Sequence, residues 1–447
     1  MRGRVVVAVL GLVLWVGGCA RHEAPLFTGE PFLVVWAGDA DRQNSDFLAV
    51  LDADPTSASY GKVLRTYPVR SRGNEPNLLT AVPRPDRLVF ATALLTSRTF
   101  VFDLRQPLAG RLLHVDEPDA RRRLWAPQEP VSLPNGYVAI ACSDPAGYRG
   151  DPREVVTAAG GLLELNSDGR RVRETSAADP TAHGFLFAPC GAALVAGGAR
   201  IVTASTAHGY AASTQGERMP GIGVQIWKVE DLTLVKTIGL EAGPRGEENL
   251  GPLTARAMRQ KPIVYVNTEG GGVYASDSIQ TEVPSFRLVY DFGAGVHGGG
   301  AALTPDDRYY VVALPGKNRV ASLDVADPWK PRPISSVRFD RDPMDSSRSR
   351  RGGPDTLTMS ADGTRIAVSD YTVDVPGFFQ DGDHRVYMMR LDPATGRLRI
   401  DGAFVDELTG EVGVNFNRTR WPHGETGPAR PKGLLLVTPE PPPAPGK

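Results

Sequence analysis

Three aspartates near the N-terminus are the first residues whose types and spacing could do chemistry. Asp39, Asp41 and Asp46 stand in the stretch "FLVVWAGDADRQNSDFLAVLDADP", and alternating carboxylates are typical of a calcium-binding loop. Such a loop would need a third ligand where Gln43 stands, and also a turn glycine and a closing glutamate that the stretch lacks. The sequence therefore favours a hairpin turn in which these side chains accept hydrogen bonds from the backbone.

Histidines are the other candidate metal ligands, because imidazole suits copper and zinc. His183 and His297 each open an apolar strand after a loop, and His208 stands in "TASTAHGYAAS". His297 also lies in the glycine run "GAGVHGGG", where the backbone can approach a ligand closely. The simpler interpretation of each is a loop histidine satisfied by hydrogen bonds, and the metal-binding alternative stays open. No HExxH, CxxC or GxSxG motif occurs in the sequence, so zinc and hydrolase chemistry lack support.

The N-terminus has the parts of a secretory signal peptide. Arg2 and Arg4 precede an apolar run over residues 5–16, and "GGCAR" follows that run. The run is shorter than the roughly 20 residues that span a bilayer. Cys19 after two glycines is typical of a bacterial lipobox, so we predict a signal peptide over residues 1–18 and a lipid on Cys19. An ordinary signal peptide with an incidental cysteine is the alternative.

The lipid on the cysteine would anchor a periplasmic protein to the bilayer. Ala20 stands where inner-membrane lipoproteins often carry aspartate, which favours the outer membrane. We expect a short polar tether over residues 19–27 and a folded body over 28–438. The proline-rich end, residues 439–447, has too little apolar surface to fold and is expected to be a flexible tail.

Composition excludes one class of partner. The net charge of -1 gives no overall field that would attract nucleic acid. The arginine cluster in "DSSRSRRGGP", residues 345–354, is interpreted as a solvated loop. Cys142 and Cys190 remain beside the lipobox cysteine, and a disulfide between them and two separate buried thiols are both open alternatives.

Short apolar runs separated by Gly, Pro, Asp and Asn recur along the whole chain and indicate β-strands. They group into six units with a period of roughly 50–65 residues, each with the content of a four-stranded blade. A seventh unit at the N-terminus has three apolar runs, and "GLLLVTP" over residues 433–439 is expected to supply its missing strand. The sequence therefore predicts an all-β, seven-bladed β-propeller closed by pairing of its N-terminal and C-terminal strands.

The order of these units resembles a known family. The stretch "LVVWAGDADRQNSDFLAVLDADPTSASYGKVLRTYPV" is similar to the opening of the selenium-binding protein family, which includes the bacterial methanethiol oxidases. The segments "SRTFVFDL", "VKTIGLEAGPRGEENLGP" and "GGPDTLTMSADGTRIAVSD" continue the resemblance over nearly the whole mature chain. It implies the same seven-bladed fold.

The resemblance also implies a copper site built from histidines at the central face of the propeller. The corresponding positions of this chain hold other residues, namely Asn77, Leu78, Ala126, Gln128, Pro130, Asn249 and residues 430–432. Copper requires imidazole or thiolate donors, which these side chains do not offer. We therefore expect a divergent family member without a copper centre or other cofactor.

Two functions remain open. The first is a monomeric, non-catalytic binding or scaffold protein that holds a small molecule or a protein at the central face. The polar residues expected to line that face are Glu75, Asn77, Gln128, Glu129, Glu247, Glu248 and Asn249. The alternative is a divergent copper-dependent thiol oxidase of the methanethiol oxidase type, with His183, His208 and His297 as replacement ligands. Loss of the family's histidines favours the first.

Overall fold

The computed structural model describes residues 27–82, 88–145, 159–182, 187–206, 221, 223–339, 353–372 and 382–440. Cys19, His183 and His208 lie outside these ranges, as do the apolar run at the N-terminus and nearly all of the arginine-rich loop. No helix in the described ranges is long and apolar enough to span a membrane.

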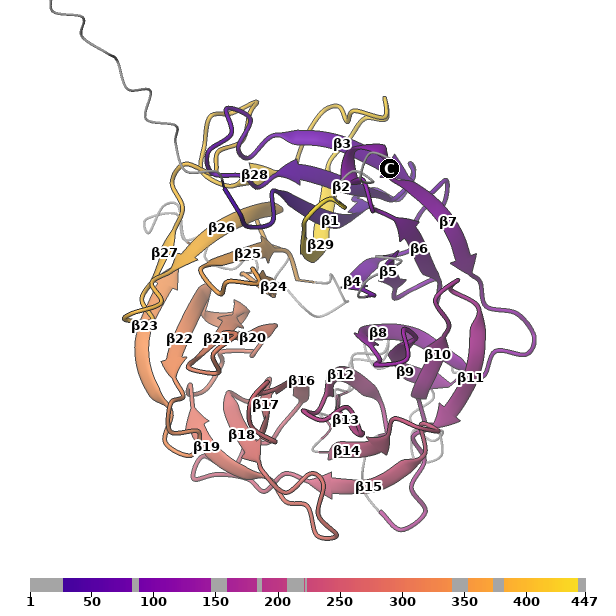
Figure 1. Ribbon diagram of the computed structural model, residues 1–447, viewed down its shortest axis with the longest axis vertical. Helices are drawn as coiled ribbons and strands as arrows, with labels where there is room; N and C mark the ends of the chain where they lie inside the picture. Colours follow the sequence, from indigo (N-terminus) through magenta and orange to yellow (C-terminus); the bar gives the residue numbers. More distant parts are fainter. Residues whose placement is uncertain are drawn as a thin grey trace, which may run out of the picture.

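The described residues form seven antiparallel sheets around a central axis, each with four strands on its main path (Figure 1). This arrangement is a seven-bladed β-propeller, as the repeats predict. From the axis outwards, blade 1 consists of β29 (Ala429–Val437), β1 (Phe32–Asp39), β2 (Phe47–Asp52) and β3 (Val63–Pro68). Blade 2 consists of β4 (Pro76–Ala81), β5 (Leu88–Ala93), β6 (Thr99–Asp103) and β7 (Arg111–Asp116). Blade 3 consists of β8 (Leu124–Ser132), β9 (Val138–Pro145), β10 (Gly161–Leu165) and β11 (Arg171–Ser176).

The other four blades repeat this plan. Blade 4 consists of β12 (Pro189–Leu194), β13 (Arg200–Ser205), β14 (Gly223–Lys228) and β15 (Leu234–Gly239). Blade 5 consists of β16 (Pro252–Ala257), β17 (Val264–Thr268), β18 (Gly272–Ser276) and β19 (Arg287–Asp291). Blade 6 consists of β20 (Ala301–Leu303), β21 (Tyr309–Leu314), β22 (Arg319–Asp324) and β23 (Arg332–Arg338). Blade 7 consists of β24 (Thr356–Met359), β25 (Arg365–Asp370), β26 (Arg385–Leu391) and β27 (Leu398–Ile400), and β28 (Val414–Asn415) also pairs with β26. Two short 3-10 helices, η1 (Pro107–Ala109) and η2 (Pro315–Lys317), lie in loops.

Apolar cores between neighbouring blades hold the ring together. Strands in the middle of a blade are buried on both faces, so β2, "FLAVLD", has every residue buried. The outermost strands face solvent, and β7, "RLLHVD", has exposed and half-buried residues in alternation along its first half. Between blades 2 and 3, for example, Phe90 and Val101 form one core with Ile140 and Leu163. The same pattern of apolar runs in the sequence therefore produces both the strands and the contacts between blades.

The ring closes through β29, which pairs with β1 in an antiparallel ladder. Leu434 and Leu436 join the core shared with blade 7, whereas Leu435 and Val437 pack on the core shared with blade 2. This alternation confirms that the C-terminal strand completes the first blade. Just beyond it, Glu440 donates a backbone hydrogen bond to the Arg105 carbonyl, so the first residues of the expected flexible tail are held against blade 2.

The aspartate-rich stretch is a hairpin turn, as expected from the failed calcium pattern. One oxygen of the Asp39 carboxylate accepts hydrogen bonds from the backbone N–H groups of Gln43 and Asn44, both at 2.8 Å. The Asp46 carboxylate accepts from the backbone N–H of Asp39 at 2.9 Å and from Asn74 at 2.8 Å. Burial raises the pKa of Asp46 to about 6, although these hydrogen bonds favour its charged form.

The two cysteines of the described ranges are buried free thiols. Cys142 lies in β9 and Cys190 in β12, so the alternative of two separate thiols is the correct one. Burial raises the pKa of both thiols to about 12, which disfavours the reactive thiolate.

An arginine clip holds the start of the described chain against blade 7. The Arg365 guanidinium is buried, donates to the Glu30 carbonyl at 3.0 Å, and lies 4.6 Å from the centre of the Phe27 ring. Arg365 opens β25 at the end that pairs with Met359 of β24. The chain thus enters the propeller at that end of blade 7.

Candidate ligand-binding cavity

All seven innermost strands lie within the described ranges, and a proline stands at or near the start of six of them. These prolines are Pro76, Pro127, Pro189, Pro252, Pro354 and Pro431. Proline has no N–H to give to a β-ladder, and the register with the next strand shifts beside most of them, as between Pro76 and Leu79. Such a bulge redirects the side chain that follows the proline. The residues after these prolines all line one cavity: Asn77, Gln128, Cys190, Leu253, Asp355 and Lys432.

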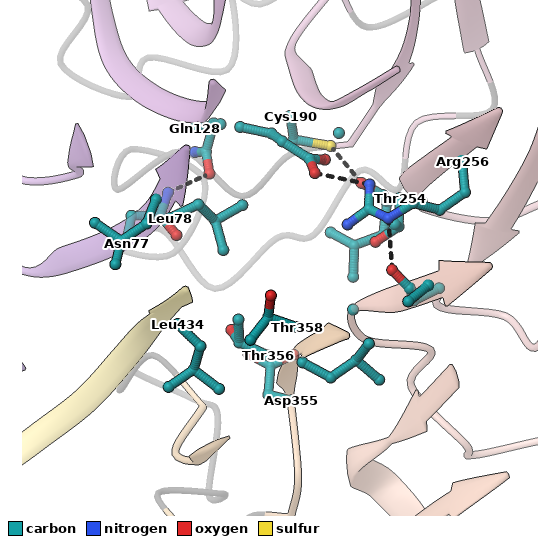
Figure 2. Close-up of a pocket in the computed structure, with 18 of the residues that line it drawn as sticks. Asn77, Leu78, Gln128, Cys190, Thr254, Arg256, Asp355, Thr356, Thr358 and Leu434 are labelled. Atoms are coloured by element: carbon teal, nitrogen blue, oxygen red, sulfur yellow. Dashed lines mark hydrogen bonds and ion pairs between the residues drawn. The ribbon is translucent and has the colours of Figure 1, made fainter. Parts of the chain in front are cut away.

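The cavity lies on the propeller axis and has a volume of about 480 Å³ (Figure 2). Side chains from several blades point into it, among them Leu78 of β4, Thr254 of β16, Thr358 of β24 and Leu434 of β29. Much of its wall is aliphatic, and threonine hydroxyls are spread between the aliphatic groups. This volume falls within the range of about 300–1,000 Å³ that is typical of small-molecule sites.

Blades 2 and 3 are joined by a pair of amides in the wall. Asn77 donates a hydrogen bond to the Oε1 atom of Gln128 at 2.9 Å, and Gln128 donates in turn to the Ser143 hydroxyl at 3.2 Å. The Thr92 hydroxyl donates to the Gln128 carbonyl at 2.8 Å. These side chains therefore satisfy one another across the blade interface, and they position Leu78 beside them.

Glu129 and Arg256 form an ion pair of 2.7 Å that reaches from blade 3 to blade 5. Glu129 also accepts from the backbone N–H of Ala192 in blade 4 at 3.0 Å, and Arg256 donates to the Ala301 carbonyl in blade 6. Burial raises the pKa of Glu129 above its ordinary value, while Arg256 and the Ala192 N–H oppose that rise. This one pair links four consecutive blades.

A second ion pair, between Lys432 of β29 and Asp355 before β24, joins blades 1 and 7 where the ring closes. Both side chains are largely buried. The acidic and basic groups of the strands around the cavity are thus matched within the protein.

The polar residues expected at the central face divide into two groups. Asn77, Gln128 and Glu129 line the cavity, and so does His297, which has a left-handed backbone with φ of 45°. The other four expected residues, Glu75, Glu247, Glu248 and Asn249, are not among the lining residues.

The side chains of these four residues, three carboxylates and one amide, form hydrogen bonds or ion pairs outside the cavity. Glu75 pairs with Arg42 at 3.1 Å and accepts from the Tyr371 hydroxyl at 2.5 Å. Glu248 accepts from the backbone N–H of Arg245 at 2.6 Å, and Glu247 pairs with the Arg245 guanidinium at 2.6 Å. Asn249 donates to the Leu240 carbonyl at 2.8 Å. Three of the seven expected residues therefore line this cavity, and the other four bond to groups outside it.

Sequence reasoning missed Cys190, Arg256 and Asp355 as lining residues, and it named Lys432 only as a position where the resemblance implies a metal ligand. The repeated proline one residue before Cys190, Asp355 and Lys432 was the available signal, since it marks equivalent positions in different blades. Arg256 carries no such mark, because it stands four residues after Pro252.

The six residues that follow the prolines of the innermost strands do not fit a copper site. They offer amide, thiol, aliphatic, carboxylate and ammonium groups, and the thiol of Cys190 is kept protonated by burial. Among the described residues, no three His, Cys, Asp or Glu side chains are grouped so that they could hold a metal ion.

Fold and site together define a class: a seven-bladed β-propeller with an axial cavity whose wall contains ion pairs between blades. No family model matches the sequence, and no curated protein matches it. Among solved structures, the chain is similar to a hypothetical selenium-binding protein from Sulfolobus tokodaii, with a TM-score of 0.72, 17% identity, and coverage of 93% of this chain and 94% of that chain. It is also similar to a proposed 6-phosphogluconolactonase from Bacteroides fragilis, with a TM-score of 0.55, 11% identity, and coverage of 92% and 99%. At these identities the likeness shows the fold alone.

Proposed function

We propose that this chain is a cell-envelope lipoprotein whose propeller binds a small, uncharged and largely apolar molecule on its axis, without catalysing a reaction. One observation carries the ligand class: the charges along the inner strands are already paired, Glu129 with Arg256 and Asp355 with Lys432. A charged ligand would lose its hydration beside these strands without finding an unpaired charge of opposite sign on them, which is costly.

The rest of the wall suits an apolar body with a hydrogen-bonding group. Leu78, Leu357 and Leu434 supply aliphatic surface, and threonines such as Thr358 supply hydroxyls. Two further charged residues line the axial cavity outside the strands. Arg259 stands in the loop after β16, and Glu269 stands in the loop after β17.

Matched six-carbon ligands test the proposal by isothermal titration calorimetry. We expect hexan-1-ol to bind, and hexanoate and hexylammonium to bind at least about ten-fold more weakly, a difference of about 1.4 kcal/mol. Leu78→Trp should fill the cavity and abolish binding of the alcohol. Leu113→Trp is the matched control, because Leu113 is exposed on β7 outside the cavity. Equal or tighter binding of hexanoate would contradict the proposed ligand class.

The copper-dependent oxidase remains the second candidate on one observation. Of its three histidines, His297 is the one inside the described ranges, and it lines the cavity. Elemental analysis of the purified protein for copper separates this candidate from the binding protein.

A further inference from the structure

A second hollow lies between blades 5 and 6, away from the propeller axis. Its volume is about 430 Å³, and it is bordered by the end of β19, by η2 with the start of β22, and by β23. Its floor is apolar and buried, and consists of Val296, Leu314, Ala321 and Leu323. None of the residues that line this groove lines the axial cavity.

Two aromatic side chains form one wall of the groove. Tyr290 and Phe292 are half-buried, with ring centroids 4.8 Å apart and an angle of 70° between the ring planes. They pack on the core between blades 5 and 6 without being covered completely. Aromatic faces and edges that remain partly open offer a large contact area to an apolar body.

Two cations stand at the rim. Lys317 ends η2, Arg319 opens β22, and between them Asn318 adopts a left-handed backbone with φ of 53°. Arg319 donates one hydrogen bond to the Ser336 hydroxyl at 3.2 Å, and neither cation forms an ion pair with a residue of the described ranges. The rim therefore carries two positive charges that the surrounding described structure leaves unmatched.

The acids on the neighbouring strands do not neutralise these charges. Asp291, beside Tyr290, is held by Arg245 at 2.7 and 2.8 Å. Asp324, at the far end of β22, pairs with Arg332 at 3.1 Å. The groove is thus positive at its rim and apolar at its floor, whereas the axial cavity has its inner-strand charges paired.

We propose that this groove binds a small organic anion with an aromatic or aliphatic body, such as a carboxylate or sulfonate. The anionic group would lie between Lys317 and Arg319, and the body would rest on Tyr290, Phe292 and the aliphatic floor. This site is independent of the proposed axial function.

The fluorescent sulfonate 1-anilinonaphthalene-8-sulfonate is the probe, titrated into the full mature chain at low salt. Lys317→Gln/Arg319→Gln should weaken its binding by about ten-fold or more, because two charge contacts of typical strength are lost. Lys261→Gln/Lys330→Gln is the matched control. Both lysines are exposed and lie outside the groove, and replacing them removes the same amount of charge. Octanoate should displace the probe, and octan-1-ol should not.

Separate variants locate the probe. Phe292→Ala should also weaken its binding, with no change of charge, whereas Leu78→Trp in the axial cavity should leave it unchanged. The proposal is overturned if the Lys317/Arg319 double variant binds the probe as well as the original protein does. It is equally overturned if the control variant loses as much affinity, or if only Leu78→Trp abolishes binding.

Discussion

Glu129 joins the inner strands of blades 3, 4 and 5 through its carboxylate. Its carboxylate is held between the Arg256 guanidinium and the Ala192 N–H, and its side chain is only 15% exposed. Removing one member of a buried ion pair leaves the other charge without compensation, which costs more than the pair itself contributes. Replacing either Glu129 or Arg256 alone should therefore destabilise the protein more than replacing both with uncharged residues.

Arg256→Met should lower the free energy of unfolding by about 3 kcal/mol at pH 8. Without Arg256 the pKa of Glu129 should rise further, and a carboxyl group whose pKa is raised in the folded state contributes less stability as pH increases through that pKa. The loss should therefore be smaller at pH 5. Urea denaturation at both pH values measures it, and Glu129→Gln/Arg256→Met should recover most of the loss. Equal losses at both pH values would show that Glu129 does not carry the effect.

Asp46 should titrate with a pKa near 6, which carbon-13 NMR of its carboxyl group can follow. Between its ordinary pKa of about 3.9 and this value, the folded state binds the proton more tightly than the unfolded state, so its contribution to stability falls as pH rises. Asn74→Ala removes the side-chain donor to Asp46 and should raise this pKa further. Ser71→Ala, which changes a partner of Asn74 but not of Asp46, is the control. A lower pKa in Asn74→Ala would refute the role given to that hydrogen bond.

At the scale of elements, the fold was predictable and most of the site was not. The count of apolar runs in the first unit indicated a missing strand, and period-two alternation placed Leu434 and Leu435 on opposite faces of it. The ion pair of Glu129 with Arg256 joins two blades, and no local pattern in either strand requires the other. Glu248 was expected at the site because it lies in "GPRGEENLGP", where the resemblance implies a ligand, yet its carboxylate accepts a hydrogen bond from a backbone N–H in its own turn.

Truncation tests the closing strand. Ending the chain after Lys432 removes the ladder from Gly433 to Val437 and four aliphatic side chains, worth on the order of 6–10 kcal/mol before the entropy cost. That variant should unfold or aggregate, because it exposes a long unpaired edge. Ending the chain after Thr438 loses only contacts such as the Glu440 hydrogen bond and should melt within a few degrees of the full chain. Equal melting temperatures for the two truncations would contradict closure through β29.

At the scale of the whole molecule, a ring of blades can keep its shape while its centre changes. Neighbouring blades share apolar cores, and hydrogen bonds and ion pairs such as those of Asn77 with Gln128 and Glu129 with Arg256 join their inner strands.

We expect no stoichiometric copper after expression in copper-supplemented medium, because the proline-marked positions lack imidazole. Elemental analysis of the purified protein is the measurement. About one tightly held copper per chain, lost when His183, His208 or His297 is replaced, would instead support the oxidase.

Lipidation of Cys19 predicts that Cys19→Ser releases a soluble or unprocessed form, measured by fractionation of cells. The several acyl chains of a bacterial lipoprotein anchor it stably, whereas one chain binds only marginally. A processed Cys19→Ser protein that stays with the membrane would contradict the proposed anchor.

The arginine clip at Phe27 sets which way such an anchored propeller faces. Residues 19–26 span at most about 28 Å when fully extended, so the end of blade 7 that carries Arg365 would lie close to the bilayer. Asp355 and the other residues that follow the prolines lie at the opposite end of the innermost strands, and Met359 and Leu303 lie at the membrane end. A molecule leaving the bilayer would then meet Met359, Leu303 and the exposed Arg259 first. One arriving from solution would meet Asn77, Asp355 and Lys432 first.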